Sequence, residues 1–154
     1  MNIQLREIQI DEKDTLRKML LVYEQELLKG ENPQEYKYLD LYWQESDRVP
    51  FFILVDQEIA GFVLLNSHCL KNADGRNIAE FYVDQAHRRN GIGKKAATQV
   101  FSKYKGTWEV RTLSGNTAVH FWEDVISDLT NGNFEKIQQH DTARKGFIFT
   151  FNFD

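Results

Sequence analysis

Two arginines and two glycines lie close together near the middle of the chain, in an arrangement that suits phosphate binding. Arg88, Arg89, Gly91 and Gly93 stand between a predicted strand and a predicted helix. Glycines at such a junction let the backbone turn tightly and approach a ligand. The unpaired N–H groups of a helix's first turn, together with the helix dipole, favour an anion at the same place. The segment therefore predicts a phosphate-binding turn.

The charge of the surrounding segment supports an anionic ligand. Residues 86–105 contain no acidic residue, although the whole chain has a formal net charge of -4. The cations of this segment are Arg88, Arg89, Lys94, Lys95, Lys103 and Lys105. A cationic segment in an acidic protein favours a bound polyanion, and a solvated helix face beside a turn is the alternative. Neither common nucleotide motif fits, because no loop ends in Gly-Lys-Ser/Thr and Ala96 takes the place of the third glycine in Gly-x-Gly-x-x-Gly.

A strand and a helix are predicted to hold this turn in place. The strand covers Ile78–Val83, where residues alternate and are rich in β-branched and aromatic types. From Ile92 onward the apolar residues recur every three or four positions, which is the spacing of one helix face. A further strand is predicted at 108–113. A strand–helix–strand unit makes its two strands parallel, so a ligand is expected at their carboxyl ends.

The pattern Arg88-x-x-Gly91-x-Gly93, directly after a strand that ends in Phe81-Tyr82-Val83, resembles the acetyl-CoA-binding signature of the GNAT acyltransferase superfamily. The Phe121-Trp122 segment downstream strengthens the resemblance, which extends over essentially all 154 residues. It implies an α/β (α+β) fold with a mixed, mostly antiparallel sheet of about seven strands and about four flanking helices. It also implies transfer of an acetyl group from coenzyme A to an amine, and it places the chain with bacterial predicted acetyltransferases whose acceptor is not established.

The resemblance also implies which residues bind acetyl-CoA. The turn and the first helical residues would hold the pyrophosphate, while the preceding strand and the helix after residue 115 would line the rest of the cofactor site. The cofactor-binding residues expected on this basis are Phe81, Val83, Arg88, Arg89, Asn90, Gly91, Ile92, Gly93, Lys94, Asn116, Phe121 and Trp122.

The sequence departs from the family pattern in the helix predicted at 116–129. In the family, an asparagine that contacts the cofactor stands three residues before the alanine, and a tyrosine that can act as general acid follows the phenylalanine. Aligned on Ala118 and Phe121, these positions hold Gly115, with Asn116 one place later, and Trp122. An indole N–H is too weak an acid to release a proton at neutral pH. A thiolate, whose parent thiol has a pKa of about 8.5, can still leave with help from water or a fixed dipole.

Glu80 is the candidate general base, because it lies two residues before Tyr82 on the same face of the predicted strand. Partial burial would raise its pKa and let it take a proton from an amine, directly or through water. A strand-edge glutamate paired with a lysine or arginine is an equally supported alternative. A backbone N–H of Phe81 or Val83 is expected to bind the oxyanion. Tyr82 and Tyr104 are both candidates for the general acid.

The remaining elements complete one predicted domain, residues 1–154. The pattern predicts further strands near 3–10, 51–55 and 59–70, a helix from an N-cap at Asp11 to Gly30, a shorter helix from Pro33 to about Ser46, and a closing hairpin of 134–141 and 144–153. Four phenylalanines share one face of the last strand. We interpret them as core, with an acceptor wall or a homodimer surface as the alternative. They are Phe147, Phe149, Phe151 and Phe153.

Acidic residues outnumber basic ones by ten to five between Asp11 and Asp47. In proteins that this chain resembles, the first two helices line the acceptor cleft, so the excess could attract a cationic amine. A solvated surface is the commoner explanation of such a bias. The acceptor is expected to be a small-molecule or peptide amine, which the sequence does not identify further.

Composition argues against several other classes of protein. Cys69 is the only cysteine, which rules out an intrachain disulfide and a thiolate-rich zinc site and favours a reducing, cytoplasmic setting. No histidine has a partner at metal-ligand spacing, so no metal is expected. His68 could be a second base, although a structural histidine whose hydrogen bonds are satisfied is the commoner role. The N-terminus has no long apolar run, which argues against a membrane span. A short basic segment without stacking aromatics argues against nucleic-acid binding.

The sequence predicts an acetyl-CoA-dependent N-acetyltransferase in which an amine attacks the thioester directly. The alternative is a sensor or regulatory module that binds acyl-CoA without turnover. Trp122 and the displaced Asn116 keep this alternative open, because they leave the general acid unassigned.

Overall fold

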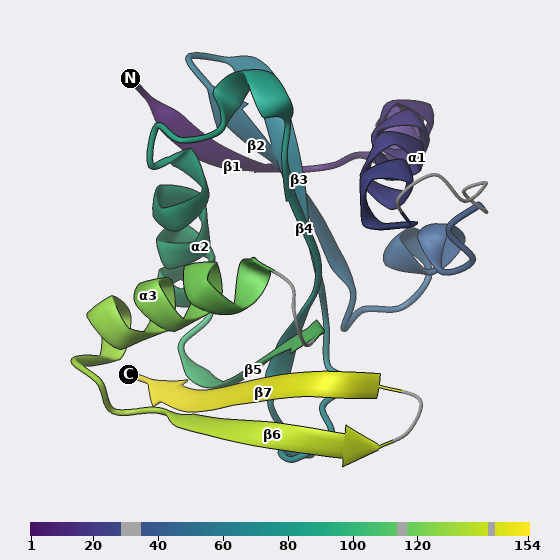
Figure 1. The fold of residues 1–154 in the computed structure, drawn as a ribbon. Coiled ribbons are helices and arrows are strands. Elements are labelled where there is room, and N and C mark those ends of the chain that lie inside the picture. The colour runs from purple at the N-terminus through teal and green to yellow at the C-terminus, as the bar shows by residue number, and fades with distance from the viewer. Residues whose placement is uncertain (29–34, 114–116, 142–143) are drawn as a thin grey trace.

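Seven strands form one sheet in the computed structural model, which describes residues 1–28, 35–113, 117–141 and 144–154 (Figure 1). The spatial order is β1-β2-β3-β4-β5-β7-β6, and every neighbouring pair in this sheet is antiparallel except β4 and β5. The strands are β1 (Ile3–Glu7), β2 (Val49–Val55), β3 (Glu58–Asn66), β4 (Arg76–Val83), β5 (Gly106–Leu113), β6 (Glu135–Asp141) and β7 (Arg144–Phe153). The predicted mixed, mostly antiparallel sheet is confirmed.

Helices cover both faces of the sheet, as Figure 1 shows. The helices α2 (Ile92–Lys103) and α3 (Ala118–Thr130) lie on one face, and α1 (Lys13–Leu28) lies on the other face with the 3₁₀ turn η2 (Leu39–Trp43). Two further 3₁₀ turns, η1 (Ile10–Glu12) and η3 (Gln85–His87), precede α1 and α2.

The described residues form three α-helices, whereas four helices were expected. The missing helix is the one predicted from Pro33 to about Ser46, and within its described part, residues 35–46, only Leu39–Trp43 is helical, as a 3₁₀ turn. Tertiary contacts fix this tighter turn: Tyr42 is buried, and the indole of Trp43 donates to the Ile8 carbonyl at 3.0 Å. Pro33 itself lies outside the described residues.

Several other boundaries differ from the prediction. The first strand, predicted near residues 3–10, ends at Glu7, and Ile10 begins η1. Asp11 lies within η1 and does not cap α1; Glu12 instead accepts a hydrogen bond from the Gln9 backbone N–H at 3.2 Å. The strand predicted to reach residue 70 ends at Asn66, because the side-chain oxygen of Asn66 accepts the backbone N–H of His68 at 3.0 Å and turns the chain away. Gly30, the predicted end of the first helix, lies outside the described residues.

Each face of the sheet has its own apolar core. The core under α2 and α3 contains Phe101 and Trp108. The interpretation of the β7 phenylalanines as core is confirmed, because Phe149 and Phe151 are buried in the same cluster and Phe147 and Phe153 pack against it. The core under α1 and η2 is separate and contains Leu16, Leu20, Phe52 and Phe62.

A bulge in β4 decides which face its side chains occupy. Leu64 of β3 pairs with Glu80 and the next residue, Leu65, pairs with Ile78, so Ala79 is the extra residue. Ile78 and Phe81 consequently both lie on the α2/α3 side, in contact with that core. Glu80 lies on the opposite, α1 side, where it contacts Tyr23. Tyr82 lies on the same side, within the core under α1.

The strands β4 and β5 pair over only a short length before they separate. Their parallel register covers Arg76–Ile78 and Trp108–Val110. Beyond it, β4 continues to pair with β3, and β5 continues to pair with β7. A wedge therefore opens at the carboxyl ends of the two strands, which is where the sequence predicted the ligand.

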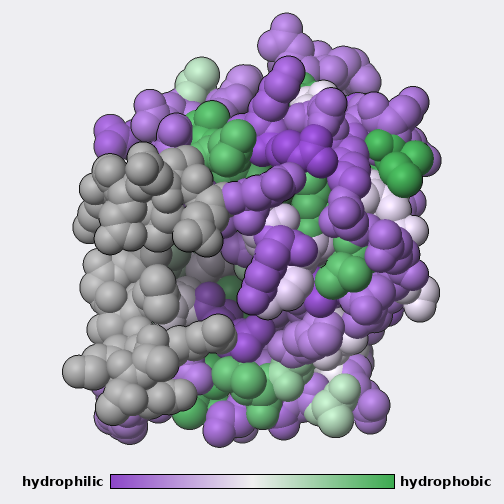
Figure 2. All heavy atoms as spheres, turned by 90° about the vertical axis from the view of Figure 1, so that its right-hand side faces the viewer, coloured by the Kyte–Doolittle hydropathy of each residue, from purple (hydrophilic) through white to green (hydrophobic). Residues whose placement is uncertain are grey.

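The face covered by α1 and η2 is mostly hydrophilic, and its apolar side chains form separate patches (Figure 2). Within the described ranges, none of the helices combines the length and the apolar character needed to cross a membrane.

Candidate active site

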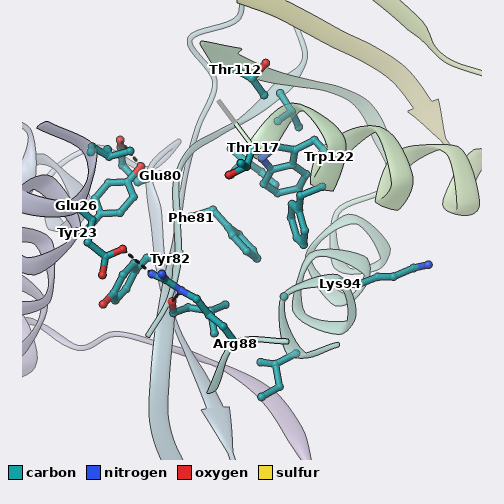
Figure 3. A pocket seen from close by; sticks show the side chains of 18 of the residues that line it. Tyr23, Glu26, Glu80, Phe81, Tyr82, Arg88, Lys94, Thr112, Thr117 and Trp122 are labelled. Carbon is teal, nitrogen blue, oxygen red and sulfur yellow. Dashed lines mark hydrogen bonds and ion pairs between the residues drawn. The ribbon is translucent and has the colours of Figure 1, made fainter. Parts of the chain in front are cut away.

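A pocket of about 760 Å³ occupies the wedge between β4 and β5 (Figure 3). Its walls come from the second half of α1, the diverging ends of β4 and β5, and the first turns of α2 and α3. The pocket brings together twelve of the residues that the sequence predicted, namely Glu80, Phe81, Tyr82, Val83, Arg88, Arg89, Gly91, Ile92, Gly93, Lys94, Phe121 and Trp122. Asn90 is exposed and is not part of the lining. Asn116 lies outside the described residues.

The two glycines of the turn serve different purposes. Gly91 is the N-cap of α2 with φ of 73°, a left-handed conformation that favours glycine, and a Cβ there would have nothing within 4 Å. Its carbonyl accepts the N–H of Lys95 at 3.1 Å, so the amides of residues 92–94 precede the first helical bond and are available to an anion. Gly93 instead makes room for a neighbour, because a Cβ there would lie 3.1 Å from the ring of Phe121.

Arg88 spans the pocket entrance from β4 to α1. Its Nε donates to the Val83 carbonyl at 2.7 Å, and its Nη2 lies 2.7 Å from the Glu26 carboxylate. The guanidinium also lies over the ring of Tyr82, 5.5 Å from its centroid. A phosphate that binds Arg88 must therefore compete with a carboxylate of α1.

The other two predicted cations are placed differently. Arg89 lines the pocket and has a φ of 68°, so the backbone is left-handed on both sides of Asn90. Lys94 forms an ion pair with Asp128 of α3, and Figure 3 shows its ammonium group pointing away from the pocket. Only the aliphatic part of Lys94 therefore faces the ligand space.

Glu80 lies against α1 at the point where β4 leaves β5. The Tyr23 hydroxyl donates to its carboxylate over 3.3 Å, and no ion pair to Glu80 is found among the described residues. The alternative of a strand-edge glutamate paired with a cation is therefore not what the structure has. Burial raises the pKa of Glu80 to about 7, with Glu24 adding to the rise and the hydrogen bond from Tyr23 and the charge of Arg111 opposing it. A carboxylate of this kind suits proton transfer near neutral pH.

The backbone of β4 presents polar groups to the pocket beside Glu80. The carbonyl group of Tyr82 points toward β3, because a Cβ atom added to Gly61 of β3 would lie only 2.0 Å from its oxygen. Since strand residues alternate, Val83 turns its own peptide groups the other way, and its carbonyl binds Arg88. The backbone of Phe81 makes a hydrogen bond to the Tyr23 hydroxyl. This bond lowers the pKa of Tyr23, but burial and the nearby Glu80 raise it by more, so the pKa of Tyr23 is raised overall.

The two tyrosines considered as general acids lie in different places. Tyr82 lines the pocket on the α1 side, and burial and the carboxylate of Glu26 raise its pKa. Tyr104 is not part of the pocket lining; its ring packs against Phe51 and beneath the guanidinium of Arg76. The geometry therefore leaves Tyr82 as the one of the two that could contact a ligand.

Aromatic rings form the α3 wall of the wedge. Phe81 lies 5.0 Å from Trp122 and 5.7 Å from Phe121, measured between ring centroids. Trp122 is 5% exposed, so it is mainly a packing residue with one edge on the pocket. The N-cap of α3 is Thr117, and the Thr117 side chain also lines the pocket.

Several lining residues were not expected from the sequence. Tyr23 lies in the apolar stripe of α1, a pattern that is typical of core residues, although its hydroxyl contacts Glu80. Arg111 and Thr112 belong to an ordinary alternating strand, and only the separation of β5 from β4 places them beside a pocket. The hydroxyl of Thr112 is buried and has no hydrogen-bond partner. A strand pattern alone gives no signal for such a residue.

The histidines do not enter the pocket. The ring of His68 lies 3.2 Å from the Arg48 guanidinium and is not part of the lining, so its suggested role as a second base has no support in the geometry. The Nδ1 of His87 lies 2.6 Å from Asp84, which caps η3. In the part of the chain that the structure describes, no group of His, Cys, Asp and Glu residues is arranged to hold a metal ion.

The chain belongs to the acetyltransferase (GNAT) family, whose model matches residues 14–125. The acyl donor of this family is acetyl-CoA. A sequence search of curated proteins finds no match to this chain.

Solved acetyltransferase structures share the fold at low sequence identity. An acetyltransferase from Thermus thermophilus superposes with a TM-score of 0.75 at 13% identity, over 99% of this chain and 97% of the other. The PaiA N-acetyltransferase from Thermoplasma acidophilum, in complex with coenzyme A, gives a TM-score of 0.63 at 15% identity, over 99% and 100%. An aminoglycoside acetyltransferase in complex with coenzyme A gives 0.72 at 12% identity, over 98% and 95%. The fold is thus shared with solved acetyltransferases.

Proposed function

We propose that the chain is an N-acetyltransferase that moves the acetyl group of acetyl-CoA to an amine, and that residues 1–154 form one domain with this activity. The proposal rests on Glu80, a carboxylate with a pKa of about 7 that lines the pocket beside the split between β4 and β5. With one cysteine and no disulfide, a cytoplasmic enzyme is the proposed setting.

The pocket fits coenzyme A at both of its ends. At the α2 end, the space around Gly91 leaves the first-turn amides accessible to a pyrophosphate, and Arg88 and Arg89 supply positive charge. At the other end, the walls formed by Ile78, Phe81 and Val110 are apolar and suit an unbranched chain such as the pantetheine arm. We propose that the residues of the lining named above hold the cofactor, which supplies the thioester.

Glu80 is the proposed general base. An ammonium acceptor must lose a proton before its nitrogen can attack the thioester, and a carboxylate with a pKa of about 7 is partly ionised at neutral pH. The hydrogen bond from Tyr23 fixes the orientation of the carboxylate. Glu24, on the facing part of α1, adds negative charge that attracts a cationic amine.

The backbone N–H of Phe81 is the proposed oxyanion donor, with that of Val83 as the second candidate. In this structure the Tyr23 hydroxyl occupies the Phe81 position. We propose that the thioester oxygen displaces Tyr23 there, after which Tyr23 contacts Glu80 alone. Tyr82 faces α1 with its hydroxyl close to Glu26, so we propose that it relays a proton on the acceptor side.

A second candidate, a module that binds acyl-CoA without turnover, is favoured by one observation. Trp122 packs into the core at the position where the family pattern has a tyrosine, so the α3 wall presents no ordinary acid.

The two functions are separated by thiol release from acetyl-CoA in the presence of a panel of small-molecule and peptide amines. Isothermal calorimetry with coenzyme A on the same protein tests binding independently. An enzyme releases thiol in an amine-dependent manner and loses this activity in Glu80→Gln, while Glu58→Gln, at an exposed residue that does not line the pocket, retains it. Binding of coenzyme A without thiol release from any amine would support the sensor instead.

A further inference from the structure

One polar atom beside the pocket has no partner. Thr112 is 8% exposed, and its Oγ1 is the single buried side-chain polar atom without a hydrogen bond in the described ranges 1–28, 35–113, 117–141 and 144–154. Thr112 also belongs to the pocket lining. Buried hydroxyl groups in folded proteins are hydrogen-bonded in the large majority of cases, because an unmade bond is costly. An unpaired hydroxyl at the wall of a ligand pocket indicates that the ligand supplies the partner.

The register of the sheet fixes the level of Thr112 along the wedge. Val110 is the last residue of β5 that pairs with β4, opposite Ile78. Thr112 lies two residues beyond Val110 in β5, and Glu80 lies two residues beyond Ile78 in β4. The bulge at Ala79 brings Phe81 to the same position along the wedge as these two residues. If Glu80 is the base of the reaction, the thioester lies at this level, and Thr112 faces it from the other strand.

The two residues occupy opposite faces of the sheet. Glu80 lies on the α1 side with Tyr23. Thr112 shares the α3 side with Val110, because alternate residues of a strand point to the same face and Val110 belongs to the core under α2 and α3. Thr112 also pairs with Phe147, which packs against that core. The attacking amine and the departing sulfur therefore lie on different sides of the split.

On this basis, and resting on the proposed transferase function, we propose that Thr112 donates a hydrogen bond to the sulfur of coenzyme A as it leaves. Glu80 takes the first proton of the ammonium acceptor and releases it to water. The neutral amine nitrogen then forms the new C–N bond, and the proton that this nitrogen loses after attack passes to Glu80. The electron pair of the broken C–S bond stays on sulfur, and the Thr112 O–H stabilises the resulting thiolate without giving up its proton. A hydroxyl is sufficient for this role, because a thiolate is a modest base that needs a donor and not a strong acid.

Other donors in the lining are less well placed for the sulfur. Thr117 is exposed at the N-cap of α3, and Tyr23 already donates its hydroxyl hydrogen to Glu80. Arg88 lies at the phosphate end and is bound to Glu26 and Val83. Tyr82 faces α1. Trp122, on the α3 side, is confined by ring contacts with Phe81 and Phe101. Thr112 combines the correct level, the correct face and an unused hydrogen.

The test compares Thr112→Val, which replaces the hydroxyl with a methyl group, and Thr112→Ser, which keeps the hydroxyl. The ligands are coenzyme A and desulfo-coenzyme A, which lacks the sulfur, and binding is measured by calorimetry at pH 7 and pH 9.5, on either side of a thiol pKa of about 8.5. The wild type is expected to prefer coenzyme A over desulfo-coenzyme A more strongly at pH 9.5. Thr112→Val is expected to reduce that preference by roughly tenfold, as for a lost hydrogen bond to a charged group, and Thr112→Ser to retain most of it.

Thermal melting of the ligand-free proteins provides a second readout. Thr112→Val is expected to melt at the same temperature as the wild type or higher, because it removes an unpaired buried hydroxyl. The proposal would be overturned if Thr112→Val and the wild type showed the same preference for coenzyme A over desulfo-coenzyme A at pH 9.5. It would also be overturned if Thr112→Val melted several degrees below the wild type, since the hydroxyl would then have a structural partner. If the wild type fails to bind coenzyme A at all, the proposed function itself is refuted. If the wild type binds coenzyme A and Thr112→Val shows the same preference for it over desulfo-coenzyme A, only the role of Thr112 is refuted.

Discussion

Glu80→Gln removes a buried negative charge from β4 while keeping the shape of the side chain and an oxygen that can accept from Tyr23. The pKa of Glu80 in the folded protein is about 7, against an ordinary value of 4.5, chiefly because burial disfavours the ionised form. At 1.36 kcal/mol per pH unit, the ionised carboxylate costs the folded state about 3 kcal/mol, and water in the open pocket can only lower this figure. The substitution is therefore expected to stabilise the protein at high pH.

The sign of the pH dependence follows from where the proton binds. Below a pH of 4.5 the carboxyl group is protonated in both the folded and the unfolded chain, so the wild type and the Glu80→Gln variant should differ little. As the pH rises from about 4.5 through about 7, the unfolded chain ionises first, and the wild type loses the stability that the raised pKa provided. The advantage of Glu80→Gln should grow across this window and then remain constant at about 3 kcal/mol, or roughly 6 to 12 °C in melting temperature.

Urea unfolding of both proteins at a series of pH values between about 4 and 8.5 measures this difference directly. Titration of every other group cancels in the subtraction, and Glu58→Gln, at the exposed start of β3, should give a difference near zero at every pH. A difference between wild type and Glu80→Gln that does not change with pH, or a less stable Glu80→Gln at high pH, would refute the argument from burial. The same variant should lose thiol-release activity, so that function and stability change in opposite directions.

Three further predictions concern the surroundings of the site. Arg88→Ala is expected to weaken coenzyme A binding by roughly tenfold to a hundredfold in calorimetry. Glu26→Gln frees Arg88 from a carboxylate 2.7 Å away and is expected to strengthen coenzyme A binding. Stronger binding by Arg88→Ala than by Glu26→Gln would contradict a role for Arg88 in phosphate binding. Gly93→Ala places a methyl group 3.1 Å from the Phe121 ring and should cost about 1 to 3 kcal/mol in urea unfolding, with Phe121→Leu partly restoring the loss in the double variant. Glu109 is fully buried and accepts the backbone N–H groups of residues 70 and 71 at 2.7 and 2.5 Å, so Glu109→Gln should destabilise by about 1.5 to 3 kcal/mol while leaving coenzyme A affinity unchanged.

Local chemistry explains what could be predicted from the sequence. Gly91 and the arginines before it are placed by turn geometry and by the start of a helix, both of which depend on neighbouring residues only. The placement of Glu80 and Tyr82 on one face followed from strand alternation and is confirmed by their contacts on the α1 side. The β7 phenylalanines were assigned to the core for the same reason.

Features that depend on distant parts of the chain could not be predicted in this way. The bulge at Ala79 is visible only in the register with β3, so a regular strand would have placed Ile78 on the same face as Glu80. The hydroxyl of Tyr23 becomes a partner of Glu80 only because α1 packs over β4, and Thr112 faces a pocket only because β5 leaves β4. The helix expected before residue 46 failed because tertiary contacts of the aromatic side chains outweigh local propensity.

The bulge at Ala79 also explains how one strand can serve both sides of the proposed reaction. In a regular strand the wedge-facing and α1-facing residues alternate without interruption, and consecutive peptide groups are all used by the neighbouring strands. The extra residue turns Ile78 and Phe81 toward α2 and α3 and leaves Glu80 facing α1, next to the backbone of Phe81, which hydrogen-bonds to the Tyr23 hydroxyl. Because β5 departs at the same level, the space created is open on both faces of the sheet. In the proposed reaction, an amine approaches the thioester from the α1 side while the sulfur remains beside Thr112, so the proposed geometry of attack and departure depends on a single inserted residue.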